Sequence, residues 1–316
     1  MIELATFPYL NSVSSLSGVA DWSRTLDGFS QAKIKISNCD DICDYLGCWK
    51  SVLRFSEQSD ASRTYVWSGV VTQVVSSETG VEITASDFSV LISRLAKKVS
   101  GLFTPLQAWE KLAKLVYDQF HIQLDVTGVD SPFLLEFDNY TGSSVLEEIS
   151  KVTDWTVVDT TVFVGGQSRG SFDLDFLSGG YATQCKASDI YTRVTVSNGV
   201  TSVTKINTAL EQELGFQVPK TIDSTLATKT SLERYAEKWL LQAGTSLKLV
   251  TNGELDLCTD FNVFNLIPGD TYKMFYRSLC KEAEATFRVN KVFWDDNMIK
   301  IDFDQNDENE DDSGAF

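Results

Sequence analysis

The chain has a single histidine, His121, among its 316 residues. Most Ser-His-Asp arrangements and most histidine-based zinc sites are excluded when no second histidine is present. His121 lies between a helical apolar stripe and a strand pattern, where a structural or surface position is expected. The sequence also lacks a Gly-x-Ser-x-Gly elbow, a phosphate-binding glycine-rich loop and a His-Glu-x-x-His motif. We therefore expect no enzyme and no cofactor.

Basic residues are also scarce, with 27 Lys and Arg against 44 Asp and Glu and a net charge of −17. Because binding to a phosphate backbone needs clusters of Lys and Arg, this balance argues against a nucleic-acid-binding protein. No stretch approaches the roughly 18 uncharged apolar residues that cross a bilayer. The start, Met1 to Leu4, lacks the basic and apolar regions of a secretory signal, so we expect no export signal.

Six cysteines are present, and no histidine lies near any of them. The chain is long enough to build its own core, so free buried thiols are expected rather than a disulfide framework. Three of the cysteines are spaced too loosely to predict a zinc site. We therefore expect no metal. The cysteines are Cys39, Cys43, Cys48, Cys185, Cys258 and Cys280.

Strand patterns dominate residues 1–98. β-branched and aromatic residues alternate over several short segments, which predicts a meander of antiparallel strands that forms a small barrel or sandwich. A helix is expected at its end, with Ser86 as the N-cap and apolar residues at helical spacing up to Leu95. The predicted strands are 32–36, 52–55, 65–75 and 81–85.

Residues 99–170 predict an α+β middle module. Thr104-Pro105 is a strong helix start, because threonine caps well and proline is favoured at the first helical position. A further helix is expected from Ser144, which forms a Ser-x-x-Glu capping box with Glu147. A strand over 156–164 then ends at Gly165-Gly166.

Residues 171–305 return to strand patterns and predict a second β-barrel with an inserted helix over 223–242. Asn198-Gly199 and Asn252-Gly253 each predict a hairpin. Part of 171–215 is left open as strands that complete the first barrel. The acidic segment 306–316 is expected to be a disordered tail. The predicted fold class is therefore α+β, mostly β, with two small antiparallel β-barrel units and an intervening α/β module.

Four motifs follow one another along the chain: Trp67 and Gly69 in the segment 65–72, Asp87 and Arg94 in 81–95, Asp154 and Trp155 before 162–166, and Pro268, Gly269 and Asp270 in 266–270. Together they resemble the motifs of bacteriophage tail hub proteins, a family that includes minor tail proteins of long-tailed phages and the baseplate hub of contractile tails. Ala85 departs from the pattern, because many relatives have glycine close to that position.

The resemblance implies a homotrimer in the distal tail tip or baseplate of a virion, assembled in the host cytoplasm. Each subunit would contribute two similar barrels, so that three chains form a pseudo-sixfold ring between a sixfold tail tube and a threefold tip. The implied partners are the distal tail or tail tube protein, the tape-measure protein and tip spike or fibre proteins. DNA would pass through an acidic lumen without specific binding.

Two other classes remain open from the sequence. A distal tail or adhesin component would contact the host surface, and binding of host glycans by the isolated protein would favour it. A peptidoglycan-degrading tail enzyme needs two carboxylates facing across a cleft, which sequence alone does not reveal. Clearing of a peptidoglycan gel by the purified protein would favour the enzyme.

Overall fold

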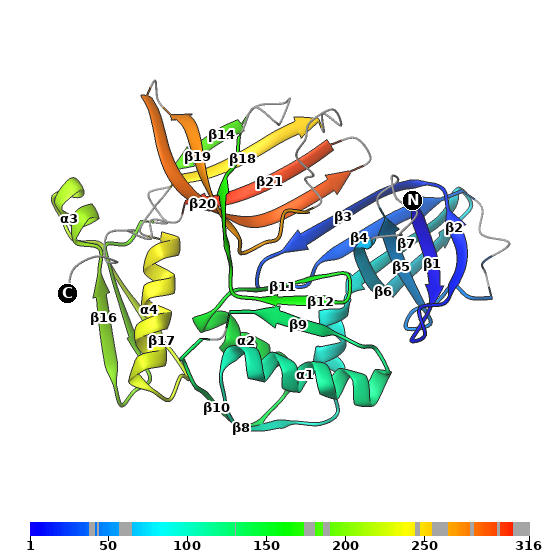
Figure 1. Ribbon diagram of the computed structural model, residues 1–316, viewed down its shortest axis with the longest axis horizontal. Coiled ribbons are helices and arrows are strands. Elements are labelled where there is room, and N and C mark those ends of the chain that lie inside the picture. Colours follow the sequence, from blue (N-terminus) through cyan, green and yellow to red (C-terminus); the bar gives the residue numbers. More distant parts are fainter. Residues whose placement is uncertain are drawn as a thin grey trace.

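The computed structural model describes residues 1–37, 42, 44–56, 65–129, 131–173, 181–185, 190–243, 247–254, 265–278, 281–295 and 298–305. The predicted acidic tail, 306–316, and the residues Cys39, Cys43 and Gly244 lie outside this part of the chain. Strands dominate the described residues, and the helices gather below one large sheet (Figure 1). The prediction of a mostly β, α+β fold is confirmed.

The large sheet draws its strands from both ends of the chain (Figure 1). Its pairing order is open among the described strands, with β14 and β2 at the two ends, so closed barrels are not confirmed. The strands in this order are β14 (Tyr181–Cys185), β18 (Leu247–Glu254), β21 (Met298–Gln305), β20 (Lys281–Asp295), β3 (Val19–Thr25), β4 (Gln31–Ile36), β7 (Gly80–Asp87), β6 (Tyr65–Ser77), β5 (Ser51–Ser56), β1 (Ile2–Thr6) and β2 (Ser12–Leu16), while β19 (Thr271–Ser278) pairs with both β20 and β13 (Ser168–Ser171).

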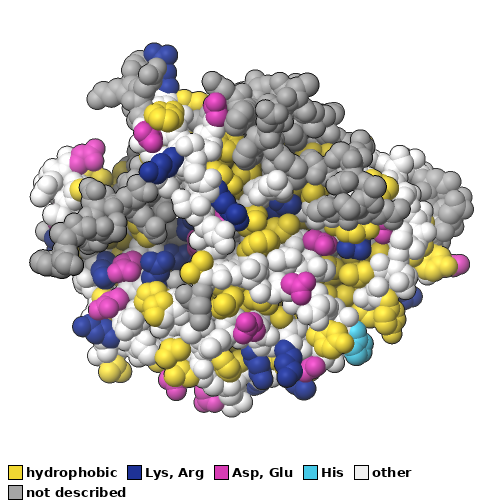
Figure 2. All heavy atoms as spheres, in the orientation of Figure 1, with side chains coloured by type: hydrophobic (Ala, Val, Ile, Leu, Met, Phe, Trp, Pro, Cys, Tyr) yellow, Lys and Arg dark blue, Asp and Glu magenta, His cyan; other side chains and the backbone are white. Residues whose placement is uncertain are grey.

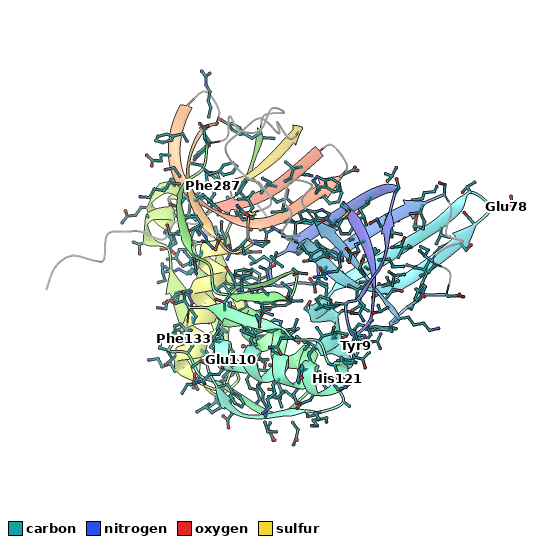
Figure 3. All side chains as sticks on the ribbon, turned by 45° about the vertical axis from the view of Figure 1, so that its right-hand side comes forward. Tyr9, Glu78, Glu110, His121, Phe133 and Phe287 are labelled. Carbon is teal, nitrogen blue, oxygen red and sulfur yellow. The ribbon has the colours of Figure 1, made fainter. Side chains whose placement is uncertain are left out.

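The two β-rich regions meet where β20 pairs antiparallel with β3. At this seam Trp294 lies opposite Trp22, and the two rings stack with centroids 6.3 Å apart. Side chains from both ends of the chain, among them Ile34 and Phe287, share one hydrophobic core. Figure 3 shows Phe287 on the upper part of the molecule, within β20. The two regions are therefore continuous in sheet and core.

The middle module packs beneath this sheet, and its hydrophobic core also includes residues of the first β-rich region and of the segment 194–236. The predicted helix start at Thr104-Pro105 is confirmed, because Thr104 and Gln107 form a reciprocal capping box. The strand predicted over 156–164 is a hairpin instead, with Asp159 at a φ of 52° in its turn. The elements are β8 (Val99–Phe103), α1 (Pro105–Phe120), β9 (Asp125–Gly128), β10 (Leu135–Tyr140), α2 (Gly142–Val152), β11 (Trp155–Val158) and β12 (Thr161–Val164).

Two predicted helix starts are wrong. Helix α2 begins three residues earlier than expected, because Thr141 is the N-cap and the amide of Ser144 is its donor. At the end of β7, the N-cap of the next segment is Asp87 rather than Ser86. The Asp87 side chain accepts a hydrogen bond from the amide of Ser89. That segment, η1 (Phe88–Arg94), is a 3-10 helix rather than an α-helix.

A third small sheet stands at the left margin of Figure 1, with α4 on its inner side. The Asn198-Gly199 hairpin is confirmed, since it joins two antiparallel strands and Gly199 has a φ of 84°. The helix predicted from residue 223 begins only at Lys229, because the residues before it form a strand parallel to β15. The elements are β15 (Arg193–Ser197), β16 (Ser202–Ile206), α3 (Thr208–Leu214), β17 (Pro219–Asp223) and α4 (Lys229–Ala243).

The second predicted hairpin, at Asn252-Gly253, is wrong. Strand β18 runs straight through these residues, and they pair with Lys300 and Ile299 of β21. Asn-Gly favours a tight turn locally, but here both residues pair with β21, and this ladder requires an extended backbone. The predicted strands after residue 270 are confirmed as β19, β20 and β21, whereas the turn residues 296–297 lie outside the described residues.

Candidate functional site

Eight of the nine family-like residues fall into two clusters. The first cluster comprises Trp67, Gly69 and Asp87, where β6 pairs with β7. Gly69 lies opposite Asp87, and a Cβ atom on Gly69 would lie 2.3 Å from the backbone oxygen of Ser86. Trp67 is buried, and its indole nitrogen donates to the backbone oxygen of Ser23 at 3.1 Å. This cluster therefore fixes a close approach of two backbones in the first β-rich region.

Asp87 is buried at the junction between β7 and η1. Its carboxylate accepts hydrogen bonds from the amides of Ser30 at 2.6 Å and Ser89 at 2.9 Å, and from the Ser89 hydroxyl. Burial raises the pKa of Asp87 to about 6, although the hydrogen bonds from both serines oppose the rise. The carboxylate therefore joins the turn before β4 to the start of η1.

We expect Asp87→Asn to flatten the pH dependence of stability. The folded-state pKa of Asp87, about 6, lies above its ordinary value of 3.8. The stability that this carboxyl contributes is therefore fully present below pH 3.8, where it is protonated, and is lost as the pH rises through 6. Between pH 5 and pH 7.5 this group should lower the unfolding free energy of the wild type by about 1–1.5 kcal/mol. Urea unfolding of both proteins at the two pH values measures the difference. Equal pH slopes would contradict the raised pKa.

The second cluster comprises Asp154, Trp155, Pro268, Gly269 and Asp270. Pro268 and Gly269 occupy the two central positions of a turn, in which the amide of Asp270 donates to the oxygen of Ile267 at 3.1 Å. Gly269 has a φ of 101°, which L-residues with side chains rarely adopt. The predicted turn before β19 is therefore confirmed.

The Pro-Gly-Asp turn is tied to the end of the middle module. The Asp270 carboxylate accepts from the amide of Gln167 at 2.9 Å and from Nε of Arg169 at 2.6 Å. A Cβ atom on Gly166 would lie 1.9 Å from the Gly269 oxygen, so only glycine fits there. The sequence motifs ending at Gly166 and at Asp270 thus meet in space.

Four charged side chains from different elements form a buried ionic cluster beside this turn. Asp154 pairs with Arg288 of β20 at 2.8 Å and with Lys238 of α4 at 2.8 Å. Lys238 also contacts the Asp27 carboxylate at 2.8 Å. Burial alone would raise the pKa of Asp154, but Lys238 and Arg288 outweigh it and hold the pKa below its usual value.

Asp27 connects the first β-rich region to the middle module. Its carboxylate accepts from the amide of Trp155 at 2.9 Å, and its own amide donates to the Trp155 oxygen at 2.9 Å. The Trp155 ring packs against Trp109 of α1, with centroids 5.1 Å apart. Burial raises the pKa of Asp27 to about 6; Lys238 opposes this rise and the charge of Asp154 adds to it. The cluster therefore joins β3, β11, α4 and β20.

Arg24 links the two clusters and was not singled out from the sequence. Its guanidinium is buried and donates to the oxygen of Val66 at 2.6 Å and to that of Leu266 at 2.8 Å. Burial lowers its pKa to about 9. Arg94, the ninth family-like residue, lies in neither cluster; its guanidinium sits 5.7 Å from the ring centre of Trp49.

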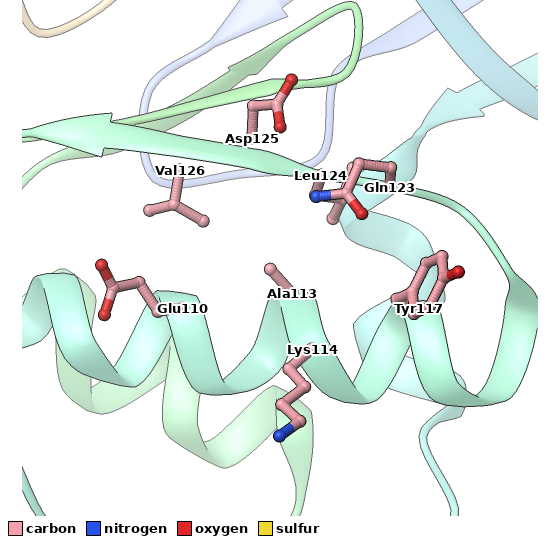
Figure 4. Close-up of a pocket in the computed structure, with 8 residues that line it drawn as sticks. All are labelled: Glu110, Ala113, Lys114, Tyr117, Gln123, Leu124, Asp125 and Val126. Atoms are coloured by element: carbon pink, nitrogen blue, oxygen red, sulfur yellow. The ribbon is translucent and has the colours of Figure 1, made fainter.

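Grooves lie on the described surface, and no catalytic set of side chains converges among the described residues. A groove of about 410 Å³ runs between α1 and β9, with Ala113 between Glu110 and Tyr117 (Figure 4). Lys114 points to the opposite side of the helix (Figure 4). His121 ends α1 in a left-handed conformation, at the lower rim of the molecule (Figure 3).

The described residues hold no group of three His, Cys, Asp or Glu side chains arranged for a metal ion. Within the same residues, no helix has the length and apolar character that crossing a bilayer demands. Figure 2 shows acidic and basic side chains interspersed over one face. Cys48 is a free thiol at the surface. The two clusters are thus suited to holding elements together rather than to chemistry on a substrate.

No family model and no curated protein sequence matches the chain. Solved structures do. A tail protein from Neisseria meningitidis MC58 superposes with a TM-score of 0.66 at 12% identity, over 97% of this chain and 96% of that one. Prophage tail protein gp18 from Listeria monocytogenes EGD-e gives 0.62 at 13% identity, over 97% and 95%.

A third solved structure, the 43 kDa tail protein of prophage MuSo2 from Shewanella oneidensis, gives a TM-score of 0.60 at 12% identity, over 96% of this chain and 97% of that one. All three similarities run from end to end of both proteins. At these identities they show the fold. The chain therefore has the fold of phage tail proteins, as the resemblance of its motifs predicted.

Proposed function

We propose that the chain is a structural, non-enzymatic hub component at the distal end of a phage tail. The observation that carries the proposal is the end-to-end fold similarity to three phage tail proteins, each covered over at least 95% of its length. The buried clusters support the proposal, because their polar side chains bind strands and helices to one another.

Three copies form a ring that adapts a sixfold tail tube to a threefold tip. Support comes from the β-rich regions at the two ends of the chain, which are joined where β3 pairs with β20. Each region acts as one barrel-like wall segment, so three chains supply six. The division into a first barrel over 1–98, a middle module over 99–170 and a second barrel over 171–305 belongs to this proposal.

The ring surrounds the channel through which DNA and the tape-measure protein pass. The net charge of −17 supports a lumen that repels the phosphate backbone, since like charges prevent adhesion. The distal tail or tail tube protein binds on one side, and the tip spike or fibre proteins bind on the other. The ring lies in the distal tail tip or baseplate of the virion after assembly in the host cytoplasm.

The mass of the purified full chain tests the ring. We expect native mass spectrometry at micromolar concentration to give three times the 35.2 kDa chain mass. A three-dimensional reconstruction of tails containing the protein should then place three copies at the distal end. A protein that stays monomeric alone and in tails would rule out the ring, whereas three copies elsewhere in the tail would rule out the hub position.

A further inference from the structure

Among the described elements, helix α4 covers one side of the sheet formed by β16, β15 and β17. Val194, Val196 and Val203 are buried on the inner side, against which α4 packs. Because side chains alternate along a strand, the residues between them point to the other side. There the outer strands β16 and β17 carry exposed residues. We call this side the threonine face; its members are Arg193, Thr195 and Ser197 of β15, Ser202, Thr204 and Ile206 of β16, and Pro219, Thr221 and Asp223 of β17.

The threonine face is regular and nearly free of net charge. Strand register places Thr204, Thr195 and Thr221 in one row across the sheet, and the hydroxyls of Thr195 and Thr204 lie 2.8 Å apart. The guanidinium of Arg193 is neutralised by the Glu211 carboxylate, with contacts of 2.6 and 3.1 Å. Asp223 is the one remaining charge among the nine positions of this described sheet.

Exposed apolar side chains border this face. Ile206 is 46% exposed within it, Phe216 is 61% exposed after α3, and Val200 at the hairpin tip is 94% exposed. Helix α3, which holds Glu211, has no buried residue. The unit thus presents apolar and hydroxyl groups and little charge to its surroundings, and a scarcity of charge is a feature of the cores of protein interfaces.

We propose that a second copy of this chain covers the threonine face, as part of the contact between subunits. This inference rests on the proposed trimer. The charge of the face favours a second copy as its partner. Two chains that each carry a net charge of −17 repel each other, so copies approach best at surfaces where charge is absent or compensated. A basic partner would instead select an acidic surface, and a nucleic acid would select a basic one. In a cyclic trimer the face of one copy meets a different surface of the next.

The open strand edges agree with this occupant. In the described sheet β16 and β17 pair only with β15, so each has one edge without a strand partner. Three strands of five residues span about 14 by 17 Å, which is roughly a third of one side of a standard interface. The face is therefore one part of a larger contact, and its loss should weaken the trimer rather than abolish folding.

The test introduces charge on the face of the full chain. We expect Thr204→Glu/Thr221→Glu to weaken trimer formation at least tenfold in sedimentation equilibrium, with an unchanged melting temperature. Thr127→Glu is the matched control, since Thr127 is an exposed threonine on the edge strand of the other three-stranded sheet. Thr204→Ser/Thr221→Ser should trimerise like the wild type.

Each outcome separates the inference from the hub proposal. If the wild type is a trimer and the double glutamate variant trimerises equally well, the proposed contact at the threonine face is wrong and the proposed ring stands. A wild type that is monomeric at all concentrations overturns both. Binding of a different tail protein at the face, with trimerisation unaffected, also overturns the inference. Hydrogen exchange on the wild type supplies a readout that needs no variant: the amides of β16 should be protected more strongly above the trimer dissociation constant than below it.

Discussion

Asp154→Leu should lower the unfolding free energy by about 3–5 kcal/mol, the range found when one member of a buried ion pair is removed. The carboxylate of Asp154 faces two cations, Arg288 and Lys238, each at 2.8 Å. Without this carboxylate, the ion-pair partner that remains for Arg288 among the described residues is the Asp304 carboxylate, 4.0 Å away. Urea unfolding of the wild type and the variant measures the loss.

The buried setting, not the number of charges, should determine this effect. Glu82→Gln is the matched control, because it removes an ion pair with Lys33 whose side chains are 47% and 39% exposed. Exposed pairs contribute about 0–1 kcal/mol, so this variant should unfold close to the wild type. Similar losses for both variants would show that Asp154 is not held between two buried cations.

A double variant separates the unpaired charge from lost packing. Asp154→Leu/Arg288→Met removes the stranded guanidinium together with its carboxylate, and Lys238 retains Asp27 and the backbone oxygens of Ser150 and Thr153. Because the cost of a broken buried pair is mostly the remaining charge, this double variant should recover at least half of the loss. If it is less stable than Asp154→Leu alone, packing rather than charge controls the site.

Local sequence signals predicted the elements whose ends are set by nearby residues. Thr104-Pro105 is an unambiguous helix start, and Ile267 to Asp270 contains every residue that its turn needs. The start of α2 was missed because both Thr141 and Ser144 are good N-caps, and tertiary packing chooses between them. A Cβ atom on Gly142 would lie 2.3 Å from the Ile92 oxygen, so η1 and the first turn of α2 are placed together.

Long-range pairing was beyond the local patterns. The dipeptide Asn252-Gly253 predicts a turn until β21 is known to pair with both residues. The pairing of β20 with β3 joins residues about 270 positions apart, and no local signal specifies such a contact. The two β-rich regions were therefore predicted as separate units, whereas the chain joins them edge to edge.

The sequence motifs marked one member, Asp154, of the ionic cluster. Asp154, Gly269 and Asp270 were singled out from the sequence, but Lys238 and Asp27 were not. One signal for Lys238 was available: it lies between Ala236 and Trp239 of an apolar stripe, and it is 7% exposed. A lysine at such a position needs a buried anion. Finding which carboxylates supply it required the fold.

Gly69→Ala should strongly destabilise the first β-rich region. Gly69 lies in β6 between Leu53 of β5 and Asp87 of β7, so its backbone is held on both sides. The new Cβ would lie 2.3 Å from the Ser86 oxygen and 2.4 Å from the Trp67 ring. A backbone oxygen in a paired strand cannot move aside without breaking its ladder, so we expect a loss of about 3 kcal/mol in urea unfolding.

Gly28→Ala is the matched control for the added methyl group. Its Cβ would meet atoms no closer than 3.4 Å, and Gly28 does not have a left-handed φ. This variant should therefore stay within about 1 kcal/mol of the wild type. The larger substitution Gly69→Val should be worse than alanine if sterics control the position. If alanine and valine at 69 both unfold like Gly28→Ala, β6 and β7 do not approach as closely as the buried Trp67 and Asp87 require, and the first cluster does not form.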